Sequence, residues 1–297
     1  MPDPFSSNSF PIRPVSPRAA VWKLRTCTLQ LPPLPLWMGI VNVTPDSFSD
    51  GGEFFAASAA VAHSLDLVEQ GADVLDIGGE STRPYADPVS ADEEIRRVVP
   101  VIEQVARETS VPISIDTSKA AVARAAIDAG AEIINDISGL EGDPEMLPLA
   151  VETGVGVCAM HMQGTPQTMQ DNPQYEDLVP EIYNYLLQRR DALLAAGIDR
   201  ERICLDPGVG FGKSHEHNLK LMANCIEFHN LGCPLLVGHS RKAFLGKIVG
   251  DKSADRLPAT VGAAVSLARQ GVQVIRVHDV RPAREAVLAF AATGGLA

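Results

Sequence analysis

Short apolar runs alternate with helix-like segments along this chain, and a polar residue, a charged residue or a turn follows each run. The runs span residues 37–41, 74–75, 111–115, 133–134, 155–160, 203–205, 235–237 and 274–275. Buried parallel strands read as continuous apolar runs because helices cover them. Eight strand–helix units predict an α/β fold of the (β/α)8 or TIM-barrel type, in which the carboxyl ends of the strands meet on one open face. The polar residues that follow the runs are therefore the first candidates for a functional site.

The segments between the runs carry the usual signals of helix ends. Gly71, Gly130, Gly154 and Gly197 predict C-terminal caps, because glycine readily adopts a left-handed backbone. Ser90 predicts the N-cap of the acidic segment that follows it. Helices are therefore predicted at residues 58–70, 91–108, 118–128, 144–153, 175–196, 216–229, 258–270 and 282–292.

The N-terminal region differs from the rest of the chain. Residues 1–20 are rich in proline and serine and predict a disordered arm, followed by a single barrel domain at residues 21–297. Residues 21–31 partly alternate between apolar and polar positions, which predicts a strand or a hairpin. Since this segment precedes the first barrel strand, we expect it to cover the closed end of the barrel.

Composition narrows the class of partner. The 297 residues have a formal net charge of −12 and no long lysine or arginine cluster, which argues against a nucleic-acid partner. No apolar stretch reaches the ~20 residues that a membrane span needs. The five cysteines lack C-x-x-C spacing, which predicts reduced thiols and a cytoplasmic protein. We therefore expect small molecules as the partners.

Eight motifs give the chain a specific resemblance. They are M-G-I-V-N-V-T-P-D-S-F-S-D-G-G (38–52), G-A-D-V-L-D-I-G-G-E-S-T-R-P (71–84), S-I-D-T (114–117), N-D-I-S-G (135–139), M-H-M-Q-G-T-P (160–166), D-P-G-V-G-F-G-K (206–213), S-R-K-A-F-L-G (240–246) and R-V-H-D-V (276–280). In this order they resemble the pterin-binding dihydropteroate synthases. Several of the motifs are weak evidence when taken singly, whereas eight in order are highly specific.

The resemblance implies an activity in folate biosynthesis. The family is a transferase that joins (7,8-dihydropterin-6-yl)methyl diphosphate to 4-aminobenzoate and releases diphosphate, by an SN1-like substitution. It is the target of sulfonamides. The same resemblance implies Mg2+ as the cofactor and a homodimer formed through outer helices.

Three residues on the first and last strands form the first candidate set. Strands one and eight are neighbours in a closed barrel, so Asn42, Arg276 and His278 can share a site. An arginine offers a planar fork that suits phosphate oxygens. The plain alternative is a turn asparagine and a solvated arginine. The resemblance implies that all three bind the diphosphate.

Four residues at the ends of central strands form the second set, namely Asp116, Asn135, Asp206 and Lys242. Carboxylates accept hydrogen bonds from the amino and ring N–H groups of a pterin, while an asparagine does both and a lysine donates. The alternative is a structural Asp–Lys ion pair across the barrel mouth. The resemblance implies that these four bind the pterin, and that Asp116, Asp206, Lys242 and Arg276 are catalytic.

Two long loops and the turn after the seventh strand supply the remaining candidates. Carboxylates near a diphosphate suit Mg2+, and the resemblance implies that Asn42, Asp46 and Asp50 hold the metal. Taken alone, the two aspartates predict no more than a solvated Pro-Asp turn.

The aminobenzoate site follows from the resemblance alone. It implies that Phe48, Thr82, Arg83 and Ser240 contact this substrate, with Phe48 as an aromatic wall.

The chain departs from the family pattern at two positions. Tyr85 stands where the family usually has glycine, and His239 stands where an apolar residue is usual.

Two other functions share parts of the pattern. A non-catalytic pterin-binding paralogue would be expected to lose the first loop or Lys242, and neither loss is seen. A methyltetrahydrofolate–corrinoid methyltransferase would share the pterin set but needs no diphosphate pocket.

Overall fold

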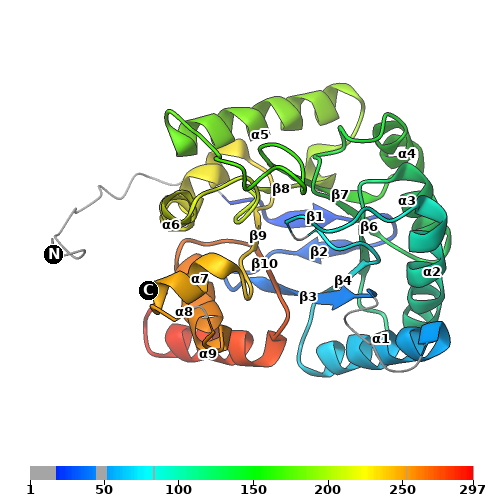
Figure 1. The fold of residues 1–297 in the computed structure, drawn as a ribbon, viewed down its shortest axis with the longest axis horizontal. Helices are drawn as coiled ribbons and strands as arrows, with labels where there is room; N and C mark the ends of the chain where they lie inside the picture. Colours follow the sequence, from blue (N-terminus) through cyan, green and yellow to red (C-terminus); the bar gives the residue numbers. More distant parts are fainter. Residues whose placement is uncertain (1–17, 45–51, 83, 252, 297) are drawn as a thin grey trace, which may run out of the picture.

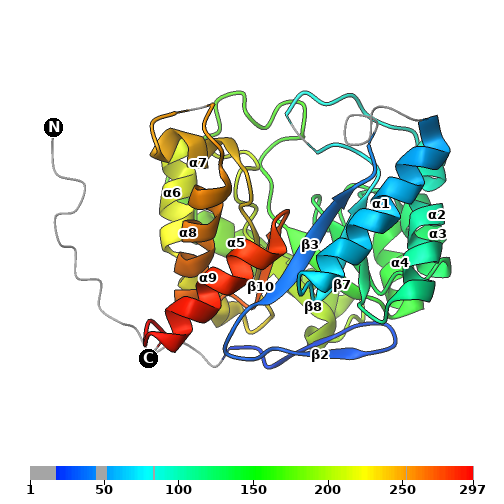
Figure 2. The same cartoon turned by 90° about the horizontal axis from the view of Figure 1, so that it is seen from below.

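Eight parallel strands close into a barrel surrounded by helices (Figures 1 and 2). The structure is a computed structural model and describes residues 18–44, 52–82, 84–251 and 253–296, with side chains in the first long helix described from residue 57. The strand order is β8-β7-β6-β5-β4-β3-β10-β9. A parallel bridge between Leu205 and Leu235 joins the two ends of this series, so the barrel closes between β8 and β9. The predicted fold class is confirmed.

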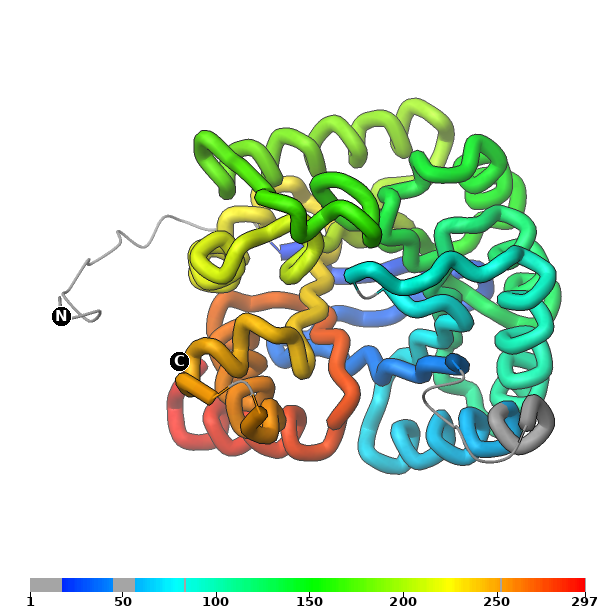
Figure 3. Tube along the Cα trace, viewed as in Figure 1, coloured from blue at the N-terminus to red at the C-terminus, as the bar shows by residue number. Residues whose placement is uncertain are grey.

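Each predicted apolar run gives one barrel strand. The strands are β3 (Leu36–Asn42), β4 (Val74–Gly78), β5 (Ile113–Asp116), β6 (Ile133–Asp136), β7 (Gly156–Met160), β8 (Ile203–Asp206), β9 (Leu236–Gly238) and β10 (Val274–Val277). The chain winds once around the barrel and brings β10 back beside β3 (Figure 3). The two strands that frame the predicted diphosphate pocket are therefore direct neighbours.

The helices form the outer layer. They are α1 (Gly52–Glu69), α2 (Ala91–Glu108), α3 (Ala120–Asp128), α4 (Met146–Thr153), α5 (Leu178–Ala195), α6 (His215–Ala223), α7 (Ala243–Ile248), α8 (Leu257–Arg269) and α9 (Val280–Ala292). The predicted cap of α2 is confirmed, since Ser90 Oγ accepts from the N–H of Glu93 at 3.3 Å. Two details differ. The helix predicted at 216–229 breaks into α6 and a 3-10 helix, η3 (Cys225–Leu231), and α7 was not predicted at all.

An N-terminal hairpin covers the closed end of the barrel, as predicted. Strands β1 (Val21–Lys23) and β2 (Thr28–Gln30) pair antiparallel and lie across the base (Figure 2). Trp22 and Leu24 are buried against an apolar layer inside the barrel. This layer contains Met38, Val74, Ile133, Cys158, Cys204, Leu236 and Val274. Trp22 also donates from Nε1 to the carbonyl oxygen of Arg202 at 3.1 Å.

The inward-facing residues next to this apolar layer, toward the open end of the barrel, are polar. Side chains two positions apart on a strand share a face. Two residues beyond Val74, Ile133, Cys204 and Val274 stand Asp76, Asn135, Asp206 and Arg276. The barrel therefore has a dry base and a mouth lined by charged and amide groups.

The described segment before β1 contacts the barrel. Ala19 accepts from Gln273 Nε2 at 3.3 Å, and the Arg18 guanidinium donates to the carbonyl oxygen of Pro33 at 3.3 Å. Most of the arm predicted at residues 1–20 lies outside the described residues. No helix within the described ranges is long and apolar enough to cross a membrane. All five cysteines are free thiols.

Candidate functional site

Arg276, on β10, binds carboxylates on two other strands at the barrel mouth. Its Nε donates to Asp76 Oδ2 at 2.5 Å, and one terminal nitrogen donates to Asp116 Oδ2 at 2.6 Å. Asn135 Nδ2 donates to the same oxygen of Asp76 at 3.1 Å. Burial alone lowers the pKa of Arg276, but the two carboxylates outweigh it and raise this pKa above its usual value. We call Asp76, Asp116, Asn135 and Arg276 the Arg276 cluster.

Asp116 titrates close to neutral pH. Burial raises its pKa most, Arg276 opposes this effect, and the charges of Asp76, Glu94 and Asp136 raise it further, to about 7. The Asp116 side chain is only 13% exposed, so little water reaches it. A carboxyl group with such a pKa changes charge easily when a ligand or a counter-ion arrives.

Asp206 and Lys242 stand on the other side of the mouth. Asp206 is buried and accepts from the N–H of Gly208 at 2.7 Å, while burial raises its pKa. Lys242 precedes α7, donates from Nζ to the carbonyl oxygen of Val209, and lies 4.4 Å from the centroid of the Phe211 ring. Burial lowers the pKa of Lys242 to about 7. Arg276 forms ion pairs with Asp76 and Asp116, whereas Lys242 is held by a carbonyl oxygen and an aromatic face.

The loop after β8 is held in a tight conformation. Gly208 has φ +69, and a Cβ atom there would lie 1.8 Å from the carbonyl oxygen of His161. Only glycine fits that position. Lys213, which is 2% exposed, donates to the carbonyl oxygen of Phe211 at 2.8 Å and lies 3.0 Å from His161 Nδ1. Burial lowers the pKa of Lys213 well below its ordinary value. This loop is therefore a rigid support for the Phe211 ring and for Lys242.

Residues at the ends of β9, β10 and β3 form the third part of the mouth. Ser240, just after β9, accepts from the N–H of His278 at 3.2 Å, and its hydroxyl lies 3.0 Å from His278 Nδ1. Asn42 ends β3 and is half-buried. Because β10 pairs with both β9 and β3, the ends of these three strands border one region. The structure thus joins Ser240 to His278, which the family resemblance assigns to two different substrates.

The loop between β4 and α2, described at residues 79–82 and 84–90, is held at two points. At its base, Lys119 Nζ donates to Glu80 Oε2 at 2.7 Å and to Glu94 Oε2 at 2.6 Å. At its tip, Tyr85 has φ 63 and donates from its hydroxyl to Asp171 Oδ1 at 2.9 Å. Thr82, between these points, is half-buried. A left-handed backbone at Tyr85 explains in physical terms why glycine suits this position.

Four of the predicted residues, Asp46, Phe48, Asp50 and Arg83, lie outside the described residues. Of the predicted metal set, only Asn42 is therefore described. Among the described residues, no group of three or more His, Cys, Asp or Glu side chains is arranged to hold a metal ion.

Sequence reasoning missed two members of this site. The sequence pattern marks Asp76 only as the end of an apolar run, although it lies two positions beyond an inward-facing valine and accepts from Arg276. Phe211 stands inside a glycine-rich loop and was not predicted to face the mouth. The period of two along β4 was a signal that could have identified Asp76.

His239 is a buried neutral side chain. It has no exposed surface, and its Nε2 lies 2.9 Å from the carbonyl oxygen of Thr260, so Nε2 carries the proton. Burial lowers its pKa to about 4. The unusual histidine therefore belongs to the packing between β9 and α8.

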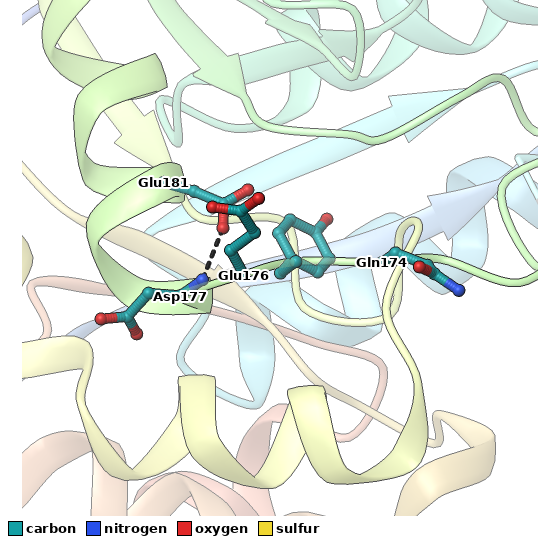
Figure 4. A pocket seen from close by; sticks show the side chains of 5 residues that line it. Gln174, Glu176, Asp177 and Glu181 are labelled. Atoms are coloured by element: carbon teal, nitrogen blue, oxygen red, sulfur yellow. Dashed lines mark hydrogen bonds between the residues drawn. The ribbon is translucent and has the colours of Figure 1, made fainter.

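A separate pocket at the start of α5 is lined by acidic side chains, which would repel a diphosphate. It encloses about 530 Å³ and is lined by Gln174, Tyr175, Glu176, Asp177 and Glu181 (Figure 4). Its lining carries three carboxylates and no arginine or lysine. The N–H of Asp177 donates to Glu181 Oε1 at 2.6 Å, as Figure 4 shows, so one carboxylate is already engaged by the backbone. The barrel mouth remains the better candidate site.

Comparison with known proteins identifies relatives along almost the whole barrel. A family described as "Pterin binding enzyme" matches residues 38–278. The dihydropteroate synthase of Escherichia coli (strain K12) is 48% identical over 259 residues, which cover 87% of this chain and 92% of that protein.

Two solved structures are similar in fold and sequence. The Yersinia pestis dihydropteroate synthase with a sulfonamide drug has a TM-score of 0.86 and 46% identity, covering 93% of this chain and 99% of that one. The Xanthomonas albilineans dihydropteroate synthase with 4-aminobenzoic acid has a TM-score of 0.87 and 43% identity, covering 94% of this chain and 100% of that one.

Proposed function

This chain belongs to the dihydropteroate synthase family of pterin-binding enzymes, and we propose that it condenses (7,8-dihydropterin-6-yl)methyl diphosphate with 4-aminobenzoate. The products are 7,8-dihydropteroate and diphosphate. The observation that carries this proposal is the convergence of Asp116, Asn135, Asp206 and Arg276 from four strands on one barrel mouth. Together these four residues offer hydrogen-bond acceptors and donors to a pterin edge and a cation to a diphosphate.

The pterin pocket consists of Asp116, Asn135, Asp206 and Lys242. The carboxylates accept from the amino and ring N–H groups of the pterin, and Lys242 donates to a ring acceptor. Asp206 is buried, so hydrogen bonds made there are poorly screened by water. A pterin analogue that lacks these donors leaves buried polar groups unpaired and is rejected strongly.

Arg276, His278 and Asn42 form the diphosphate pocket. The guanidinium offers a planar fork to phosphate oxygens and stabilises the charge that develops as diphosphate leaves. Arg276 keeps its positive charge at any physiological pH, because neighbouring carboxylates raise its pKa. His278, whose ring is oriented by Ser240, adds a hydrogen bond beside it.

Mg2+ is part of this proposal, with Asn42, Asp46 and Asp50 as the residues that hold it. The amide oxygen of Asn42 at the end of β3 is a hard oxygen ligand of the type that Mg2+ prefers. When bound, the ion supplies positive charge to the diphosphate leaving group.

The substitution proceeds in an SN1-like manner. The bond between the exocyclic carbon and the diphosphate oxygen breaks first, and the electron pair leaves with the diphosphate. The positive charge on the carbon spreads into the pterin ring, where Asp116 and Asp206 stabilise it. The amine of 4-aminobenzoate then attacks the carbon and loses a proton. Holding both rings together supplies much of the rate.

The second substrate lies between the loops after β3, β4 and β9. Ser240 contacts its carboxylate, and Thr82, Arg83 and Phe48 complete the pocket. The hydrogen bond between Ser240 and His278 supports this assignment, because it sets the two substrates side by side. Phe211, beside Lys242, gives the same region a flat aromatic surface.

The proposal includes a homodimer in the cytoplasm. Leu219, Ile248 and Leu288 are large apolar side chains that are exposed on α6, α7 and α9, which lie on one side of the barrel (Figure 1). That side is the one we assign to the partner subunit. Four buried thiols and one exposed thiol, none of them in a disulfide, suit a reducing compartment.

The test is the release of diphosphate from (7,8-dihydropterin-6-yl)methyl diphosphate in the presence of Mg2+, with and without 4-aminobenzoate. Release that requires 4-aminobenzoate and yields dihydropteroate supports the synthase. Pterin binding without turnover, in folded protein with metal present, favours a non-catalytic paralogue.

A further inference from the structure

Asp76 is a fully buried carboxylate in the barrel mouth to which the proposed function assigns no role. It lies in the middle of β4 and has no exposed surface. One oxygen, Oδ2, accepts two hydrogen bonds, while the other, Oδ1, is buried without a partner among the described residues. A buried charge is costly unless surrounding groups stabilise it, so its presence here calls for a physical reason.

The two donors to Asp76 belong to different pockets. Arg276 Nε, at 2.5 Å, is part of the residue assigned to the diphosphate. Asn135 Nδ2, at 3.1 Å, is part of a residue assigned to the pterin. A single carboxylate oxygen on β4 therefore sets the relative position of a residue on β10 and a residue on β6.

We propose that Asp76 is a positioning residue that holds Arg276 by its Nε while the terminal nitrogens of the guanidinium change partner from Asp116 to the diphosphate. This inference rests on the proposed function. Arg276 presents Nε to Asp76 and a terminal nitrogen to Asp116. Binding of diphosphate requires the terminal nitrogens, and binding of the pterin requires Asp116. Both demands are met when Arg276 turns about the contact that Asp76 maintains.

The charge of Asp76, and not only its hydrogen-bonding capacity, is needed for this role. Once Asp116 turns to the pterin, Asp76 is the remaining carboxylate of the Arg276 cluster. An asparagine at position 76 still accepts from Arg276 Nε. Because it carries no negative charge, the guanidinium is then attracted mainly to Asp116. The exchange of partners then becomes less favourable, and the diphosphate is bound by a cation in the wrong orientation.

The first experiment is steady-state kinetics of Asp76→Asn. We expect kcat to fall by about 10- to 100-fold, the usual effect of removing a group that orients a site residue. We expect no rise in KM for the dihydropterin diphosphate, because removal of a negative charge does not weaken attraction for an anion. A structural defect would raise KM and lower the melting temperature together.

Asp73→Asn is the matched control. Asp73 lies three residues earlier, is half-buried and accepts from the N–H of Trp37 at 2.8 Å, away from the Arg276 cluster. It reports the effect of neutralising a structural aspartate beside the same strand. The inference is overturned if Asp76→Asn keeps a kcat within twofold of the wild type, or if the two variants change kcat and KM in the same way.

A second measurement needs no variant at position 76. The Nε–H proton of Arg276 should exchange slowly with water in 15N-labelled wild-type protein, both alone and with Mg2+ and pyrophosphate. Arg276→Lys identifies the signal, and Arg107, whose side chain is 75% exposed, gives the rate for a solvated arginine. Exchange as fast as that of Arg107 once pyrophosphate binds would overturn the inference.

The proposed function and the role of Asp76 fail in different ways. Absence of dihydropteroate formation by the wild type would refute the proposed function. Normal turnover by the wild type, together with a rapidly exchanging Arg276 Nε–H, would refute the role of Asp76 alone.

Discussion

Arg276 donates to Asp116 at 2.6 Å across the barrel mouth, so the residue assigned to the diphosphate and a residue assigned to the pterin bind each other. Under the proposed function, both groups exchange a protein partner for a substrate when the site fills. Burial raises the pKa of Asp116 to about 7 although Arg276 opposes this effect, so a carboxylate that loses Arg276 needs donors from the substrate in its place. Substrate binding and charge state are coupled through this one contact.

Asp116→Asn should lower kcat far more than it lowers affinity for pyrophosphate. The amide keeps the size of the side chain but removes the negative charge that stabilises the pterin cation. Loss of one such electrostatic contact typically costs about 100-fold in rate. Single-turnover kinetics and calorimetric titration with Mg2+ and pyrophosphate measure the two quantities separately. Unchanged turnover would remove Asp116 from the mechanism.

The pH profile of kcat/KM should be bell-shaped with its maximum near pH 7. Burial above all raises the pKa of Asp116 to about 7, and burial lowers the pKa of Lys242 to about 7. The reaction needs a carboxylate and an ammonium, so activity falls as Asp116 gains a proton below this pH and as Lys242 loses one above it. Asp116→Asn should abolish the acidic limb and keep the alkaline one. A flat profile from pH 6 to pH 8 would contradict the prediction.

His239 should make the folded state sensitive to acid. Its pKa is lowered to about 4 by burial, whereas an unfolded histidine titrates at about 6.5, so between these values the unfolded state binds more protons. The free energy of unfolding therefore falls as pH falls from about 6.5 toward 4, by at most about 3 kcal/mol from this group.

His239→Leu is the test of that sensitivity. Urea unfolding at several pH values should give a shallower dependence of stability on pH than in the wild type. Part of the slope should remain, because burial lowers the pKa of His161 to about 3 and acts in the same direction. An identical slope in the two proteins would show that His239 does not stay neutral in the folded state.

Tyr85→Phe should raise KM for 4-aminobenzoate and leave KM for the dihydropterin diphosphate unchanged. The substitution removes only the hydroxyl that donates to Asp171, so the loop carrying Thr82 loses a side-chain contact with the loop after β7. The backbone N–H of Tyr85 still donates to the carbonyl oxygen of Pro166 at 3.3 Å. Asp171→Asn is the control, since an amide oxygen still accepts from Tyr85. Equal effects on both KM values, or a larger effect in Asp171→Asn, would argue against a role in placing the second loop.

The strands of the barrel and the polar residues at their ends could be predicted from the amino-acid sequence alone. The reason is that apolar runs are local, and that parallel strands of a barrel end on one face wherever they stand in the chain. Asp116, Asn135, Asp206 and Arg276 follow from those two facts. Helix α7 escaped prediction because its six residues carry no repeat long enough to recognise.

Which residues contact each other at the mouth was decided only by the tertiary structure. Asp76 and Arg276 are 200 positions apart, and Tyr85 and Asp171 are 86 positions apart. Their contacts depend on the register and tilt of strands that are distant in sequence. The motifs predicted candidate residues for the site, because their order along the chain follows the order of the strands. The closed barrel determined that one buried carboxylate, Asp76, lies between the two pockets, because only packing brings β4, β6 and β10 within hydrogen-bonding distance.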